Sequence, residues 1–254
     1  MFNDLRDKDN LRTYVTYVIM LCCIGVTVGC MIFTNLINVF SVSLDESGNL
    51  FNHFSFIFFH GFDDSSSIVH LLTNLYFLFV IGGTVEKVLG TMRFLLVSLV
   101  IILIYGLSVY LAQVYGPAAT GLIWAYAPLL SFILMEGRRI KTRAAYEEHF
   151  SFLRVNLIII GTVLPIFTIF LQFYLSKDGI SIFQALKEGL IPFGINIAIG
   201  FLMVFLFKNH IKNRLKSFNR RKKFTPDTID SLAMWGTLVF PAYIAVVLYF
   251  YKFF

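Results

Sequence analysis

The sequence predicts an all-α membrane protein built as one helical bundle. Of its 254 residues, 57% are hydrophobic and only 14% are charged. The mean hydropathy is +0.76, and the apolar fraction exceeds the roughly 45–50% of a soluble domain. The apolar residues also fall into runs of about 20, the length an α-helix needs to cross a bilayer. This composition excludes a soluble domain carrying a single membrane anchor.

Seven apolar runs are long enough to be membrane-spanning helices. They lie at about 13–36, 68–88, 91–113, 119–136, 153–175, 190–207 and 232–251. The first run has full span length after a charged start, so we expect it to remain as a helix rather than to be a cleaved signal peptide. No internal repeat or low-complexity tract divides the chain. We therefore expect a single membrane domain over residues 1–254.

Basic residues alternate between the predicted loops. Lys and Arg gather in the N-terminus, at 87–93, at 138–154 and at 208–223, and are absent from 41–67 and 114–118. By the positive-inside rule, this pattern predicts a cytoplasmic N-terminus and an outside C-terminus. We expect the bacterial plasma membrane as the location. The loop 208–223 is also expected to contact anionic lipid headgroups, and no nucleic acid is expected as a partner.

The first outer loop is aromatic. Residues 51–62 read FNHFSFIFFHGF, a composition typical of a segment in the outer membrane interface. His60, Asp63, Asp64 and His70 form a loose set of nitrogen and oxygen donors close to it. Their spacing matches no ligand motif. We therefore expect neither a metal nor another cofactor.

The second predicted span contains two polar residues on one face. Residues 70–90 read HLLTNLYFLFVIGGTVEKVLG, and His70 and Asn74 are one helical turn apart. Polar side chains inside a span are costly, so they normally face the protein interior or a wet cavity. One interpretation is a binding or catalytic site. The other is interhelical hydrogen bonding that only holds the bundle together.

Together with Gly82, Gly83, Glu86 and Gly90, this stretch resembles the second transmembrane helix of the rhomboid family of intramembrane serine proteases. The resemblance covers about residues 52–207. It implies a rhomboid-like bundle of six transmembrane helices plus one C-terminal helix, with flanking spans at 13–36 and 232–251. In that family, the histidine and asparagine matching His70 and Asn74 stabilise the oxyanion of the tetrahedral intermediate.

The same resemblance assigns roles in the fourth and sixth spans. Where the family has its GxSG motif, this chain has Ala118, Ala119, Thr120 and Gly121, so Thr120 holds the nucleophile position. Trp124 matches the aromatic residue that stacks on the catalytic histidine. Where the family carries that histidine, residues 194–198 read GINIA, which places Asn196 at the base position.

Small residues flank both positions. Gly121 with Ala125, and Gly194 with Ala198, form small-xxx-small pairs. Such pairs let two membrane helices approach closely. We therefore expect close approach of the fourth and sixth helices, and we take Gly121, Trp124, Gly194 and Ala198 as candidate binding residues. The cavity itself is expected to be lined by His70, Asn74, Thr120, Trp124 and Asn196.

Asn196 decides the expected activity, because a carboxamide does not accept a proton near neutral pH and so does not activate a hydroxyl. The sequence therefore predicts a rhomboid-like pseudoprotease that binds transmembrane segments of client membrane proteins without cleaving them. The alternative is an active serine-type intramembrane endopeptidase, with Thr120 as nucleophile and a non-standard base such as His70. A small transporter or channel is a third interpretation. The spans lack the several facing ionisable groups that ion pathways usually need.

Overall fold

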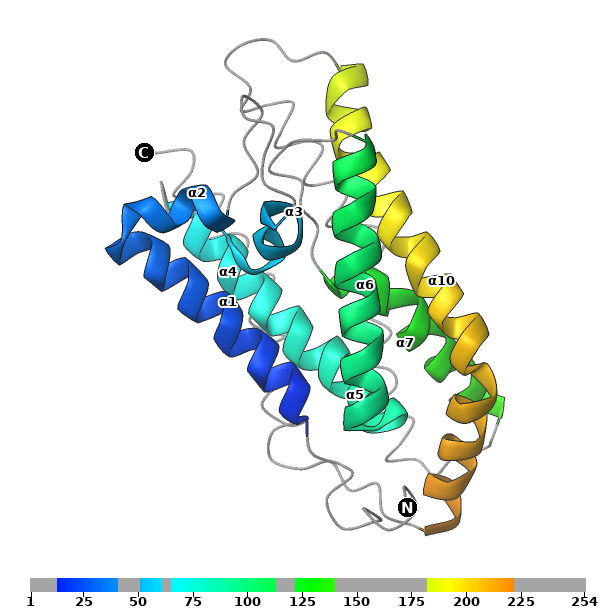
Figure 1. The fold of residues 1–254 in the computed structure, drawn as a ribbon. Coiled ribbons are helices and arrows are strands. Elements are labelled where there is room, and N and C mark those ends of the chain that lie inside the picture. Colours follow the sequence, from blue (N-terminus) through cyan, green and yellow to red (C-terminus); the bar gives the residue numbers. More distant parts are fainter. Residues whose placement is uncertain (1–12, 41–50, 61–64, 113–121, 140–181, 222–254) are drawn as a thin grey trace.

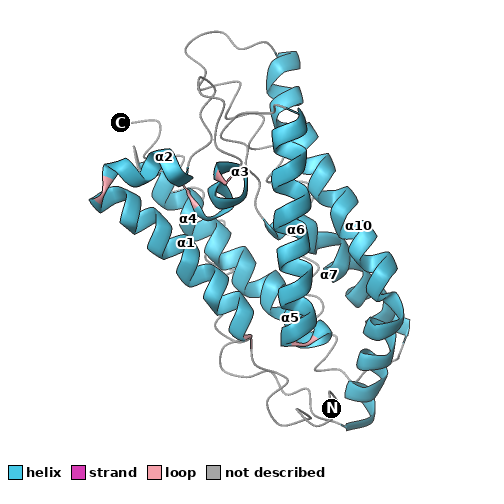
Figure 2. Ribbon diagram, in the orientation of Figure 1, coloured by secondary structure: helices cyan, strands magenta, loops and turns pink. Residues whose placement is uncertain are grey.

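The computed structural model describes residues 13–40, 51–60, 65–112, 122–139 and 182–221. These residues are almost entirely helical, and none of them forms a β-strand, as Figure 2 shows. The predicted all-α fold class is thereby confirmed. The predicted spans 153–175 and 232–251 lie outside the described residues.

Five of the predicted spans are present as helices. They are α1 (Tyr14–Ile32), the continuous segment α4 (Ser65–Phe77), η3 (Leu78–Gly82) and α5 (Gly83–Leu89), then α6 (Thr91–Ala112), α7 (Leu122–Arg139) and α10 (Ile182–Arg221). Within the described ranges, four stretches are long and apolar enough to cross a membrane, in α1, α4–α5, α6 and α10. The short elements η1 (Thr34–Leu36), α2 (Ile37–Phe40), α3 (Asn52–Ser55) and η2 (Phe56–Phe58) follow α1.

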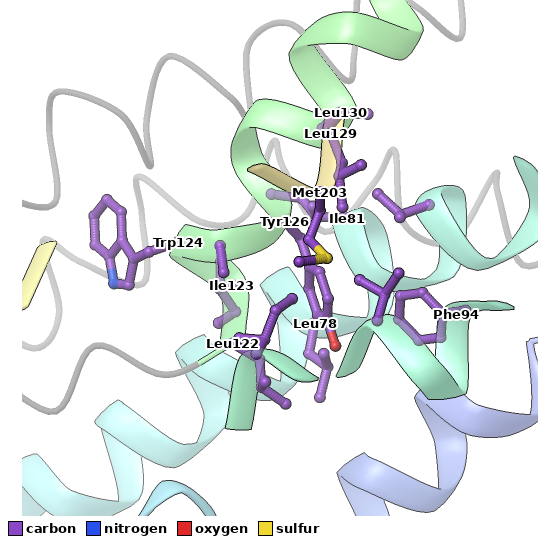
Figure 3. Packing of buried hydrophobic residues seen from close by; sticks show 14 of the residues in the cluster. Leu78, Ile81, Phe94, Leu122, Ile123, Trp124, Tyr126, Leu129, Leu130 and Met203 are labelled. Atoms are coloured by element: carbon purple, nitrogen blue, oxygen red, sulfur yellow. The ribbon is translucent and has the colours of Figure 1, made fainter. Parts of the chain in front are cut away.

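The helices pack as a bundle in which α1 lies along α4 and α5, and α10 lies along α7 (Figure 1). Between them, α6 contacts both groups. The buried core is apolar and includes Ile81, Phe94 and Leu129 (Figure 3). Among its buried polar groups, the hydroxyls of Tyr126 and Ser98 lie 2.7 Å apart and share a hydrogen bond.

The outward surface of the bundle is also apolar. Large exposed side chains on three helices include Leu21, Leu96, Leu103, Phe201 and Phe205. A water-soluble protein rarely exposes so many apolar side chains on contiguous helix faces. Lipid chains solvate them without such a cost, since they are as apolar as leucine itself.

The aromatic segment at residues 51–60 packs into the bundle. His53, Phe56 and Ile57 are buried, and the backbone of His53 lies so close to Gly106 of α6 that a Cβ on Gly106 would collide with it. The hydroxyl of Ser55 donates a hydrogen bond of 2.8 Å to the carbonyl of Val39. The loop is therefore part of the protein core on the side of α3 and η2.

The glycine and glutamate pattern of the second span joins that span to α1. A Cβ on Gly82 would meet the side chain of Thr16, and a Cβ on Gly83 would meet that of Thr13, each within ordinary contact distance. The carboxylate of Glu86 accepts hydrogen bonds from the backbone N–H groups of Val15 at 3.0 Å and Thr16 at 2.8 Å. It also accepts one from the Thr16 hydroxyl at 2.7 Å. Glu86 thus caps the positive N-terminal end of α1 from another helix.

Gly90 ends this span. Its φ of +84° is a left-handed conformation that favours glycine, and its N–H donates to the Glu86 carbonyl at 2.7 Å. The chain turns there into α6. The pattern that carried the family resemblance therefore has a structural role at the end of the bundle where α1 begins.

The predicted boundaries of the sixth span were wrong. Instead of a span at 190–207 followed by a loop, α10 is one helix of 40 residues, about 60 Å long at 1.5 Å per residue. Buried Ile211 and Leu215 continue its apolar face beyond residue 207. His210 donates a hydrogen bond of 3.1 Å to the carbonyl of Leu89, and the ammonium of Lys212 lies 3.6 Å from the Glu136 carboxylate. These contacts hold the basic residues on a helix instead of a loop.

Candidate functional site

The site predicted from the sequence draws on three helices, α4, α7 and α10. In α4, His70 is exposed and Asn74 is partly buried. Phe77 and Ile81 continue their face inward and are 1% and 0% exposed. The two polar residues therefore lie at the accessible end of a stripe whose other end enters the core.

Within the described ranges, no hydrogen bond joins the side chain of His70 or Asn74 to another helix. The span also changes its winding directly after α4. The five residues of η3, Leu78–Gly82, form a π-helix. Such segments are frequent at functional sites.

His60 contacts His70, which the sequence analysis had grouped with it in a loose set of donors without expecting a site. Their ring centroids are 5.2 Å apart with an angle of 62° between the planes. The Nδ1 of His60 lies 3.2 Å from the carbonyl oxygen of Phe58. Burial first, and the positive charge of His70 second, lower the pKa of His60 to about 4. His60 is therefore a neutral imidazole at physiological pH.

In α7, the predicted nucleophile position and its neighbour lie outside the described residues, since α7 is described from Leu122 onwards. Trp124 is 6% exposed, and its ring packs edge-on against Phe193 of α10, with centroids 4.8 Å apart and planes at 86°. Figure 3 shows Trp124 at the edge of the core cluster, with its indole ring pointing away from Tyr126 and Met203. Thr120 and Gly121 are the two predicted site residues that lie outside this description.

In α10, Asn196 is 0% exposed. The buried residues that follow it, Ile199, Gly200 and Met203, recur at the three- and four-residue spacing of one helix face. This face meets α7, because a Cβ on Gly200 would collide with the carbonyl oxygen of Ala125 and come within 2.7 Å of the Pro128 ring. The residue at the predicted base position therefore points into the bundle toward α7.

The packing predicted for Gly194 and Ala198 was wrong. Both residues are exposed, and no described atom lies within 4 Å of a Cβ built on Gly194. The reason is the helical period: residues two positions before and after Asn196 are rotated by about 200° and lie on the opposite face. The small residue that allows α7 and α10 to approach is Gly200. Counting in steps of four from the buried Asn196 identifies it in the sequence.

The described residues thus define a multi-span helical membrane protein with a polar pair at the accessible end of α4 and a buried carboxamide between α7 and α10. A model of the Rhomboid domain matches residues 47–183, just over half of the chain. The chain therefore belongs to the rhomboid family. This match includes Thr120 and ends before Asn196. No curated protein and no solved structure matches the chain.

Proposed function

We propose that this rhomboid-family protein is a pseudoprotease, which binds transmembrane segments of other membrane proteins and does not cleave them. The observation that carries the proposal is the buried carboxamide of Asn196 on the α10 face toward α7. A general base must take the proton of the attacking hydroxyl in the transition state. An amide at this position offers no basic lone pair near neutral pH.

The contact between Trp124 and Phe193 supports the same proposal. In the family, the aromatic residue of the fourth helix stacks on the catalytic histidine. Here the indole packs against a phenylalanine one turn before Asn196, with ring centroids 4.8 Å apart. The aromatic surface that would orient an imidazole contributes instead to an apolar contact between α7 and α10. That contact suits binding of an apolar helix more than chemistry.

Activity measurements test the absence of cleavage. The purified protein is expected to leave model transmembrane substrates intact and not to react with fluorophosphonate probes. The Thr120→Ser, Asn196→His double variant is the matched test, because it restores both family residues in the same scaffold. Labelling of the unmodified chain that disappears in Thr120→Val would overturn the proposal in favour of an active endopeptidase with Thr120 as its nucleophile.

Binding is tested separately by photo-crosslinking. A benzoylphenylalanine placed at Phe193, beside Trp124, is expected to capture transmembrane segments of client proteins. The same probe at Met92, which is 65% exposed on the outer side of α6, is the control for random contact in the membrane. Equal capture from both positions would contradict a specific binding site between α7 and α10.

We also propose that the N-terminus is cytoplasmic, the C-terminus lies outside, and the end of α10 contacts anionic lipid headgroups of a bacterial plasma membrane. In support, Lys208 and Lys216 are exposed, and the Lys208 ammonium lies 4.7 Å from the ring centroid of Phe205. A lysine above an exposed aromatic ring suits the membrane interface. Cysteine accessibility at both termini tests the topology. Neutral Lys208→Gln and Lys216→Gln variants should retain less anionic lipid on purification.

A further inference from the structure

Two imidazoles from separate segments meet at the beginning of the second span. His60 follows η2 and His70 lies in α4, with ring centroids 5.2 Å apart. A nitrogen bound to Zn²⁺ at about 2.0–2.1 Å places its ring centroid about 3.2 Å from the metal. Two rings with centroids 5.2 Å apart would subtend about 109° at a metal that a nitrogen of each ring binds, which is the tetrahedral angle that zinc prefers.

The hydrogen bond of His60 fixes its tautomer. The carbonyl of Phe58 only accepts, so the Nδ1 of His60 at 3.2 Å carries the hydrogen and donates it. In a neutral ring, the lone pair then lies on Nε2. Metal-binding histidines almost always make such a second bond to a carbonyl or carboxylate, because it orients the ring and raises its basicity.

We propose that His60 and His70 together bind a divalent transition-metal cation of the kind that imidazole prefers, Zn²⁺ or Cu²⁺. His70 is the first residue of a candidate span and is exposed there, so the pair lies at the end of that span. The described residues offer no third His, Cys, Asp or Glu for the same site. Water molecules would fill coordination positions that the two imidazoles leave open. The site is independent of whether the protein cleaves peptides.

Metal binding by the full-length protein in detergent, free of any histidine tag, tests this proposal. Cu²⁺ titration followed by electron paramagnetic resonance is expected to show a site with two nitrogen ligands, and Zn²⁺ is expected to compete for it. His60→Phe and His70→Phe should each weaken binding at least tenfold and reduce the signal to one nitrogen. The matched control is His210→Gln at the other end of the bundle, which should bind as the unmodified protein does.

The thermal unfolding of the same samples supplies a second readout. Zn²⁺ should raise the midpoint of the unmodified protein and leave that of His60→Phe unchanged, because a cation stabilises only the state that binds it. A two-nitrogen copper spectrum that persists in His60→Phe would overturn the proposal. So would its absence from the unmodified protein, a result that does not depend on how any variant folds.

Discussion

Replacing Glu86 with alanine should release the N-terminus of α1 from the second span. Glu86 is 0% exposed, and its carboxylate accepts three hydrogen bonds from Val15 and Thr16, at 2.7–3.0 Å. A hydrogen bond to a charged group contributes about 1.5–3 kcal/mol. The three are not additive, and water enters once the carboxylate is removed. We therefore expect a loss of about 3–5 kcal/mol, less than the sum of three such hydrogen bonds.

The cysteines of α1 report this change directly. Cys23 and Cys30 are buried at 6% and 0% exposure, whereas Cys22 is exposed and is best replaced by serine in the background. A maleimide dye that fluoresces on reaction with thiols then follows the unfolding of α1 on heating in detergent. At about 2–4 °C per kcal/mol for a chain of this size, Glu86→Ala should lower the midpoint on the order of 10 °C.

Two further substitutions make the measurement specific. Thr16→Val removes the hydroxyl donor and leaves both backbone donors to Glu86, so it should cost about 1 kcal/mol. Thr84 lies in the same helix as Glu86, and Thr84→Ala removes only the hydrogen bond from the Thr84 hydroxyl to the Val80 carbonyl. This variant should have almost no effect on the unfolding midpoint. If Glu86→Ala labels no faster than Thr84→Ala, the carboxylate does not hold α1 in place and the reasoning fails.

Three other predictions follow from particular contacts. Gly200→Ala should destabilise the bundle by about 1–3 kcal/mol through overpacking against α7. Gly194→Ala should not destabilise it, because a Cβ at Gly194 meets no described atom. Equal unfolding midpoints for the two variants would refute the assignment of Gly200 to the face of α10 that packs against α7. The pKa of His60 in the folded state, about 4, lies below the unfolded value of about 6.5. Between these two pH values the unfolded state binds more protons than the folded state, so the free energy of unfolding should fall by about 3 kcal/mol from pH 6.5 to pH 4. If the stability of a His60→Gln variant depended on pH just as steeply, this prediction would be wrong. Lys212→Met should cost less than about 1 kcal/mol in chemical denaturation, because Lys212 is 39% exposed.

Apolar periodicity was enough to predict the helices and the polar stripe of the second span. The runs that became α1, α6 and α7 were identified to within a few residues, because a bilayer requires about 20 apolar residues wherever a helix crosses it. His70 and Asn74 were found for a related reason, since polar residues are conspicuous in such a run. Apolar run length and isolated polar residues are both local signals, so each can be recognised from the sequence of one helix.

Contacts between residues far apart in the sequence could not be predicted in the same way. Glu86 was identified as part of a motif, but its partner Thr16 lies 70 residues earlier. No pattern in either segment indicates that the two residues are in contact. The end of α10 was misjudged because a run of Lys and Arg resembles a loop. The four-residue spacing of Ile211 and Leu215 was the available signal that the helix continues.

The face that α10 presents to α7 limits how the asparagine at the predicted base position can be interpreted. Asn196 and Gly200 share that face, and Gly200 is held against the Ala125 carbonyl so closely that no side chain fits there. A histidine substituted at position 196 would therefore enter the bundle on the side of α7 and not the lipid. If the Thr120→Ser, Asn196→His variant stays inactive although it folds, the helix register is not the cause. The difference must then lie in the surroundings of the hydroxyl, and the site would have diverged as a whole toward binding.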